Sequence, residues 1–129
     1  MEKRRSIKVE GFSHGQQPIP AAYKVGPLFK SGGSYGLDIS KGRIPDDINE
    51  QIQLMFENLS RFLAAAGAAL DYVVKFIVCV CNITGCGASN AGWIRIFPDV
   101  SSRPAHHAQI NNQLPGKMFV QCDFTADCG

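Results

Sequence analysis

The chain has 129 residues, enough for one domain with a hydrophobic core and too few for two ordinary domains. Apolar residues make up 45% of it, and no apolar run approaches the roughly 18 to 20 residues needed to cross a bilayer, so we do not expect a membrane protein. The formal net charge of +2 is too small to indicate a nucleic-acid partner.

The amino-terminal segment has no export signal and no clear element. Residues 1–5 are charged, but the apolar stretch of a secretory signal does not follow them, so we expect a cytoplasmic protein. The segment that follows is rich in Gly, Gln, Pro and Ser. We therefore expect a flexible leader over residues 1–19 and a single domain over residues 20–129.

A short strand is predicted at residues 28–31, which read Leu-Phe-Lys-Ser. It runs into Gly32 and Gly33, where the backbone can approach a neighbour or a ligand without side-chain obstruction. A bulge or a tight turn is an equally good interpretation of the two glycines.

The clearest predicted element is a long amphipathic helix. Residues 45–47, Pro-Asp-Asp, give a start signal, and Gly67 gives a stop signal. Between them, apolar residues recur at intervals of three and four, a pattern that places one helix face in the core. The residues of this stripe are Ile48, Ile52, Met55, Phe56, Leu59, Phe62, Leu63 and Ala66.

The second half of the chain begins with a predicted buried strand over residues 72–81, which are mostly β-branched and apolar. A loop is expected over residues 84–87. A short helix is then expected over residues 89–97, capped by Ser89 or Asn90.

Two final strands are predicted over residues 105–110 and 117–125. The order is then strands, a long helix, a strand, a short helix and two strands. A sheet with the helices on one face is the economical way to bury these elements.

The five cysteines form an odd set, and without an export signal we expect reduced thiols rather than a disulfide framework. Cys79, Cys81 and Cys86 could be combined with histidines into a zinc site, because thiolate and imidazole suit that ion. Their spacing is not that of a zinc finger, and two of them fall in a predicted strand. We therefore expect no metal site.

The order and spacing of short motifs resemble those of the reactive-intermediate deaminase family, also called RidA or YjgF. The resemblance covers nearly all of residues 20–126. It is carried by Leu28-Phe29-Lys30-Ser31-Gly32, Leu37-Asp38, Gly42-Arg43-Ile44-Pro45-Asp46-Asp47, Asn58-Leu59, Ala65-Ala66-Gly67, Val74-Lys75, Asn90-Ala91, Phe97-Pro98, Arg103-Pro104-Ala105, Leu114-Pro115 and the last strand.

This resemblance implies an α/β (α+β) subunit with a single-domain, chorismate-mutase-like or YjgF-type fold. Such a subunit has a mixed β-sheet with two helices packed on one face, and it assembles as a ring-shaped homotrimer with a ligand cleft at each subunit interface. Family members with deaminase activity hydrolyse enamines and imines to a keto compound and ammonia without a cofactor. An arginine after Pro-Ala holds the substrate carboxylate, and a glutamate on the last strand positions or activates water.

Position by position, the resemblance places His106 where the deaminases have arginine and Gln121 where they have glutamate. These two are the expected catalytic residues. The residues expected to bind substrate are Ser31, Gly32, Asn90, Ala105 and Cys122.

Both replacements weaken the usual chemistry. Histidine lacks the permanently charged planar fork of arginine, and with an ordinary pKa of roughly 6.5 it is charged only part of the time near neutrality. The amide of Gln121 can hold a water molecule but cannot accept its proton. Asp123 is expected to replace the glutamate only if a bulge changes the strand register. Arg103 is an alternative cation, although it precedes Pro104 at the rim.

Three functions remain open from the sequence. The first is hydrolysis of a small enamine or imine, on a substrate that lacks the amino-acid carboxylate. The second is a trimeric protein that has lost catalysis and binds a small metabolite as a signal. The third, RNA cleavage or inhibition of translation, has little support, because aromatic residues are not interleaved with basic ones.

Overall fold

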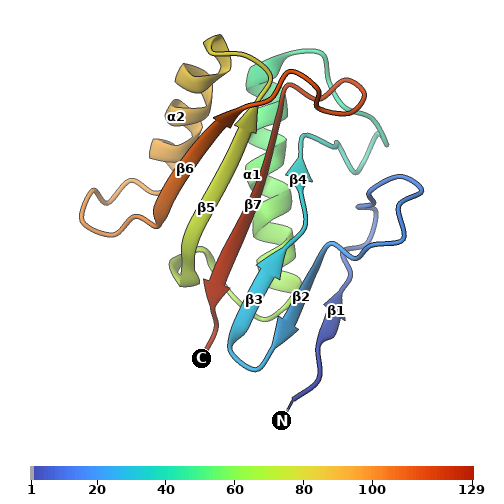
Figure 1. Ribbon diagram of the computed structural model, residues 1–129, viewed down its shortest axis with the longest axis vertical. Helices are drawn as coiled ribbons and strands as arrows, with labels where there is room; N and C mark the ends of the chain where they lie inside the picture. Colours follow the sequence, from blue (N-terminus) through green and yellow to red (C-terminus); the bar gives the residue numbers. More distant parts are fainter. Residues whose placement is uncertain (1) are drawn as a thin grey trace.

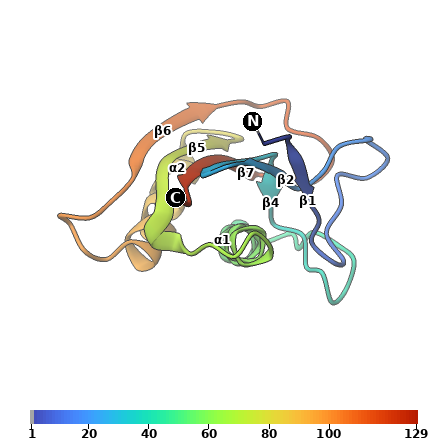
Figure 2. The same ribbon diagram turned by 90° about the horizontal axis from the view of Figure 1, so that it is seen from below.

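The computed structural model describes residues 2–129, in which seven strands form one sheet and two helices cover one of its faces (Figure 1, Figure 2). The spatial order is β1-β2-β3-β7-β5-β6, and β4 also pairs with β7. Strands β5 and β6 run parallel and the other pairs are antiparallel. The elements are β1 (Arg5–Ile7), β2 (Ala22–Val25), β3 (Leu28–Ser31), β4 (Ser34–Tyr35), α1 (Ile48–Ala65), the single 3-10 turn η1 (Leu70–Tyr72), β5 (Val73–Val80), α2 (Thr84–Ile96), β6 (Ala105–Ile110) and β7 (Val120–Asp127).

This arrangement confirms the mixed sheet with two helices on one face. Helix α1 ends within one residue of its predicted end, and the Asp47 carboxylate caps it by accepting the Glu50 N–H at 3.1 Å. Its apolar stripe packs under the sheet, where the rings of Phe56 and Phe76 stack with centroids 5.6 Å apart. No helix among residues 2–129 is long and apolar enough to cross a membrane.

Helix α2 begins five residues earlier than Ser89, so the loop expected over residues 84–87 is helical. Two of the three glycines of α2 have a packing role. A Cβ at Gly85 would lie 3.2 Å from the Ile48 Cδ1, and a Cβ at Gly92 would lie 2.7 Å from the Ile52 Cγ2. The glycines therefore allow α2 to pack closely on α1, and this tertiary contact outweighs their poor helix propensity.

Part of the segment expected to be a leader belongs to the sheet. Strand β1 pairs antiparallel with β2, and the Ile7 side chain is buried in the core. An apolar side chain at this position gains burial only if the chain pairs with β2, so composition alone was a misleading guide to residues 5–7.

The strands β5, β6 and β7 have two distinct faces because side chains alternate along a strand. The helix-covered face carries Phe76, Val78 and Phe124, which are buried. The opposite face is called the open face below. It carries residues that are half-buried or exposed: Lys75, Ile77 and Cys79 on β5, His107 and Gln109 on β6, and Gln121, Asp123 and Thr125 on β7.

Candidate functional site

A cavity of about 370 Å³ lies where β4 and β7 meet the segment before β2 and the loop before β7. Its polar side chains include His14, Tyr35 and Gln121, and its apolar wall contains Ile19, Ile44, Pro115 and Met118. None of the described side chains that line it is Lys, Arg, Asp or Glu. We call this cavity the Gln121 pocket.

Gln121 reaches the pocket from the open face of β7, where it pairs with Tyr35 of β4. The Gln121 side chain lies directly against Gly33, since a Cβ at Gly33 would be 3.0 Å from the Gln121 Cδ. A side chain at position 33 would therefore push the amide aside. Here the predicted close approach of the glycine backbone is confirmed.

His14 lies on the other side of Gly33. Its Nε2 is 2.7 Å from the Gly33 carbonyl oxygen, and its ring sits over Gly32, where a Cβ would be 3.4 Å from the His14 Cε1. The Tyr35 hydroxyl donates to the Ser13 carbonyl at 2.5 Å, which fixes the same segment. Burial raises the pKa of Tyr35, so its hydroxyl stays protonated near neutrality.

Ser31 supports this region rather than lining the pocket. Its hydroxyl oxygen accepts the Phe124 backbone N–H at 2.9 Å, next to the last residue pair of β3 and β7. Gly32 likewise supports the site, by leaving room for the ring of His14 and by donating its N–H to the Ala21 carbonyl at 2.8 Å.

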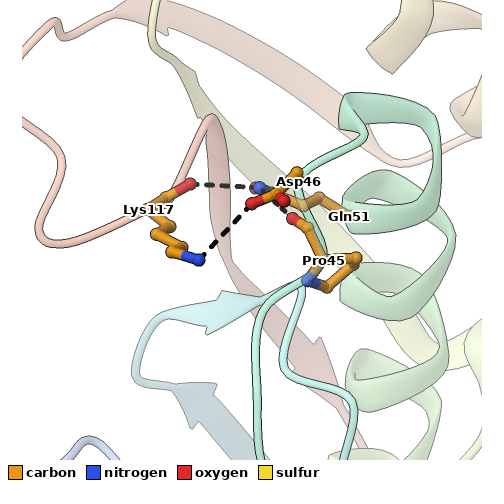
Figure 3. A network of polar contacts seen from close by, with 4 residues as sticks. All are labelled: Pro45, Asp46, Gln51 and Lys117. Carbon is orange, nitrogen blue, oxygen red and sulfur yellow. Dashed lines mark hydrogen bonds and ion pairs between the residues drawn. The ribbon is translucent and has the colours of Figure 1, made fainter.

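The far wall of the pocket is held by Gln51, a fully buried polar residue of α1 (Figure 3). Its Nε2 donates to the carbonyl oxygens of Pro45 at 2.8 Å and Lys117 at 3.0 Å, and its Oε1 accepts the Phe119 N–H at 2.9 Å. These bonds fix the loop that carries Pro115 and Met118. They also explain why β7 starts at Val120 rather than at residue 117. The ion pair of Lys117 with Asp46, at 3.5 Å, is exposed and adds little.

His106 lies elsewhere, at the β6 edge of the sheet and on its helix-covered side. Its ring stacks on Trp93 of α2, with centroids 4.5 Å apart and an interplanar angle of 18°. Its Nε2 is buried and has no hydrogen-bond partner among residues 2–129. Burial lowers the pKa of His106 below its ordinary value, and the positive charges of His107 and Lys75 add to this effect.

Asn90 is exposed on α2, three residues before Trp93, and residues three apart in a helix are neighbours on its surface. Asn90, Trp93 and His106 therefore form a second group, which we call the edge cluster. Within one chain the edge cluster and Gln121 lie on opposite faces of the sheet, so the structure does not bring the two expected catalytic residues together in a single subunit.

The other expected site residues are distributed as follows. Ala105 is exposed on the open face beside Lys75. The thiol of Cys122, an expected substrate-binding residue, does not line the pocket, because Cys122 is 1% exposed in the core, and burial raises its pKa well above the ordinary value. Adjacent residues of a strand point to opposite faces, so a pocket containing Gln121 excludes Cys122.

Local geometry bears on two further alternatives. Gln121 and Asp123 share the open face, since residues two apart in a strand do, and the expectation that a bulge would be needed was wrong. Burial raises the pKa of Asp123, while Lys30 opposes this effect. The Nε of Arg103 donates to the Phe97 carbonyl at 2.7 Å, which ties this side chain to the end of α2.

Two residues that line or support the pocket belong to no sequence motif. His14 falls within the segment expected to be a leader and meets Gly33 only through the fold. Gln51 interrupts the apolar stripe of α1 next to Ile52, and a polar residue on the buried side of a helix was the only available signal.

Comparison with known proteins places the sequence and the fold in a family. The sequence model of the endoribonuclease L-PSP family matches residues 15–128. A RutC family protein from Pyrococcus abyssi is 30% identical over 110 residues, which cover 84% of this chain and 85% of the relative.

Two solved structures show the same fold at low sequence identity. The YjgF gene product of E. coli superposes with a TM-score of 0.86 at 20% identity, covering 95% of this chain and 98% of the other. E. coli TdcF with bound serine superposes with a TM-score of 0.88 at 18% identity, covering 97% and 99%. Because the family model spans most of the chain, and the sheet and its two helices agree with these structures, the protein belongs to the endoribonuclease L-PSP family, which is the RidA/YjgF family indicated by its motifs.

Proposed function

We propose that the protein hydrolyses a small imine or enamine that lacks a carboxylate, giving a carbonyl compound and ammonia in a cleft between the subunits of a homotrimer. The observation that supports this proposal is that the candidate site is divided between the two faces of the sheet. The Gln121 pocket and the edge cluster each hold polar groups suited to a ligand, yet they lie on opposite faces of one sheet. They can serve one substrate only if two copies of the chain contribute one group each.

The sheet offers surfaces for such an assembly. No helix among the described residues covers the open face, which carries Ile77 and Cys79 among polar residues. Strand β6 is an edge strand, and Ile110 on it is 57% exposed. A neighbouring copy that covers this face and edge removes apolar surface from water. Trimers are typical of the family, and the arrangement suits one.

The substrate class follows from the charges of both half-sites. The Gln121 pocket has no cationic side chain among its described lining residues, and the lowered pKa of His106 leaves its imidazole mostly neutral at pH 7. A buried carboxylate without a cation is costly. Serine, the ligand in the TdcF structure, has a carboxylate. We therefore infer that this chain takes an imine without one.

The chemistry is addition of water followed by loss of ammonia. Water adds to the carbon of the C=N bond to form a carbinolamine, which expels the nitrogen as ammonia when the carbonyl forms. An enamine first takes a proton on carbon and loses one from nitrogen to become the imine. The Gln121 amide orients the water, and the unpartnered Nε2 of His106 is available to hydrogen-bond the substrate nitrogen or oxygen. Holding the reactants in this geometry accelerates a reaction that is already easy in water.

We propose a cytoplasmic location on the ground of the cysteines. None of the five is paired in a disulfide, an arrangement that suits a reducing compartment.

The test uses imines that are generated enzymatically in the assay mixture. A flavin-dependent amine oxidase generates imines without a carboxylate, and an amino-acid oxidase generates imino acids; imine decay and ammonia release are followed with and without the protein. We expect acceleration with the amine-derived imines and less with the imino acids. Gln121→Leu should lose about tenfold or more in rate, whereas Thr125→Val, a change on the same face outside the pocket, should not.

Failure to accelerate any imine over buffer would refute the proposal. In that event a thermal-shift screen against keto compounds and amines tests the binding-protein alternative, since a ligand of the folded form raises the melting temperature. Light scattering should give a mass three times the 14.0 kDa of one chain. A monomer would leave the two half-sites apart and would also count against the mechanism.

A further inference from the structure

His14 is positioned as a histidine with one defined tautomer. A carbonyl oxygen only accepts hydrogen bonds, so the 2.7 Å contact with Gly33 requires that His14 Nε2 carries the proton in the neutral ring. Nδ1 then keeps its lone pair. Nδ1 makes no hydrogen bond to any group of residues 2–129, so it is free to accept a proton.

The ring is held by contacts on several sides. Phe12 meets it edge-on, with centroids 5.2 Å apart and an interplanar angle of 81°, and Tyr35 lies at 6.3 Å. Gly32 passes under the ring so closely that a Cβ there would be 3.4 Å from Cε1. A ring fixed in this way does not have to be reoriented for each turnover.

His14 and Gln121 flank the same residue of the same pocket. His14 bonds the Gly33 carbonyl, and Gln121 contacts the position that a Gly33 Cβ would occupy. Gln121 can orient a water molecule but cannot accept its proton, which leaves the site without a base. We propose that His14, which comes from the amino-terminal segment, is this base. It supplies the proton acceptor that Gln121 lacks. This assignment rests on the proposed hydrolysis.

The proton balance is as follows. The substrate enters as the iminium ion, and water forms its new bond to the iminium carbon as one of its protons passes to His14 Nδ1. The resulting carbinolamine is neutral and His14 is charged. His14 returns that proton to the amine nitrogen, the C–N bond breaks, and ammonia leaves as the hydroxyl oxygen forms the carbonyl and releases its proton to solvent. Iminium and water thus give the carbonyl compound and ammonium.

Few other groups near His14 can exchange a proton near neutral pH. Tyr35 of β4 stays protonated because burial raises its pKa. Lys8 and Glu10 line a neighbouring cavity with His14 and carry opposite charges. On β7 the pocket residue Gln121 is neutral, and the carboxyl of Asp123 is two residues further along the strand. Among the described side chains that line the pocket, His14 is therefore the only base.

The experiment compares His14→Gln with the wild-type protein and with Gln53→Leu, a change at an exposed residue of α1 outside the pocket and the edge cluster. A glutamine amide can still donate to the Gly33 carbonyl, but it cannot take a proton. With an amine-derived imine near neutral pH, His14→Gln should lose about 10²- to 10⁴-fold in kcat, with KM little changed. Gln53→Leu should keep the wild-type kcat and KM.

A second measurement does not depend on the variant folding. Nitrogen NMR of the wild-type histidines should show neutral His14 with its proton on Nε2 and none on Nδ1. Wild-type kinetics in His14→Gln, or a His14 proton on Nδ1 instead of Nε2, would overturn the assignment and leave the proposed hydrolysis standing. A wild-type protein inactive on every imine would overturn both.

Discussion

Replacing Gln51 by leucine tests how the wall of the pocket is held. The change keeps the size of the side chain but removes both the amide donor and the amide acceptor from a fully buried position. Three hydrogen bonds are lost, to Pro45, Lys117 and Phe119. The backbone groups they satisfied are left to water or to no partner.

The magnitude follows from these bonds. At about 1 kcal/mol net for each hydrogen bond, the free energy of unfolding should fall by about 3 kcal/mol. For a domain of this size the melting temperature should fall by about 10 °C. Because the same bonds fix the loop with Pro115 and Met118, we also expect KM to rise more than kcat falls.

Urea denaturation at one fixed protein concentration gives the free-energy change, and the fixed concentration matters because assembly of subunits adds to apparent stability. The matched control is Gln53→Leu on the same helix. Gln53 is exposed and makes a surface contact of 3.3 Å to Glu57, so its loss should change stability by less than about 0.5 kcal/mol.

A Gln51→Leu protein within about 1 kcal/mol of wild type would show that the three bonds are replaced by water at no cost. The inference that Gln51 positions the pocket wall would then be refuted.

Three other changes have defined outcomes. Gly33→Ala should leave the melting temperature nearly unchanged while lowering kcat, since only the flexible end of Gln121 has to move. A crystal structure of an active variant in which the Gln121 amide has not moved would contradict this. Because the pKa of His106 is lowered in the folded protein, the unfolded chain binds more protons than the folded one. The contribution of His106 to stability is therefore complete above about pH 6.5, and it is lost as the pH falls through the lowered pKa of the folded state. The fall in urea midpoint between neutral and mildly acidic pH should be smaller in His106→Gln, and equal slopes would refute the assignment. Gly92→Ala should cost more than about 1 kcal/mol in urea denaturation because a Cβ there meets Ile52 at 2.7 Å and Phe56 at 3.0 Å, and a neutral effect would show that the two helices separate freely.

The elements set by local periodicity could be predicted from the sequence. The stripe of α1 and the apolar, β-branched run of β5 each signal their own structure, and both helix and strand were confirmed. Helix α2 was predicted too short because Gly85 allows a close contact with α1 that local propensity does not reveal. Strand β1 was missed for a similar reason, since its only signal is one buried apolar residue, Ile7.

The site was predicted in part. The position of Gln121 in a pocket follows from the strand motif, and its alternation with Cys122 could have excluded that thiol. His14 could not have been found, because only the folded chain brings residues 14 and 33 together. Whether His106 lies on the same face as Gln121 depends on the register of β6, a parallel edge strand of six residues. That register is a property of the whole sheet.

The stacking of His106 on Trp93 gives the protein a built-in optical probe. Trp93 is the only tryptophan of the chain, and it lies at the edge where a neighbouring copy is proposed to arrive. An imidazolium ring quenches indole emission more strongly than a neutral imidazole does. The emission of a single residue therefore reports both the protonation of this histidine and the arrival of another subunit, without any label.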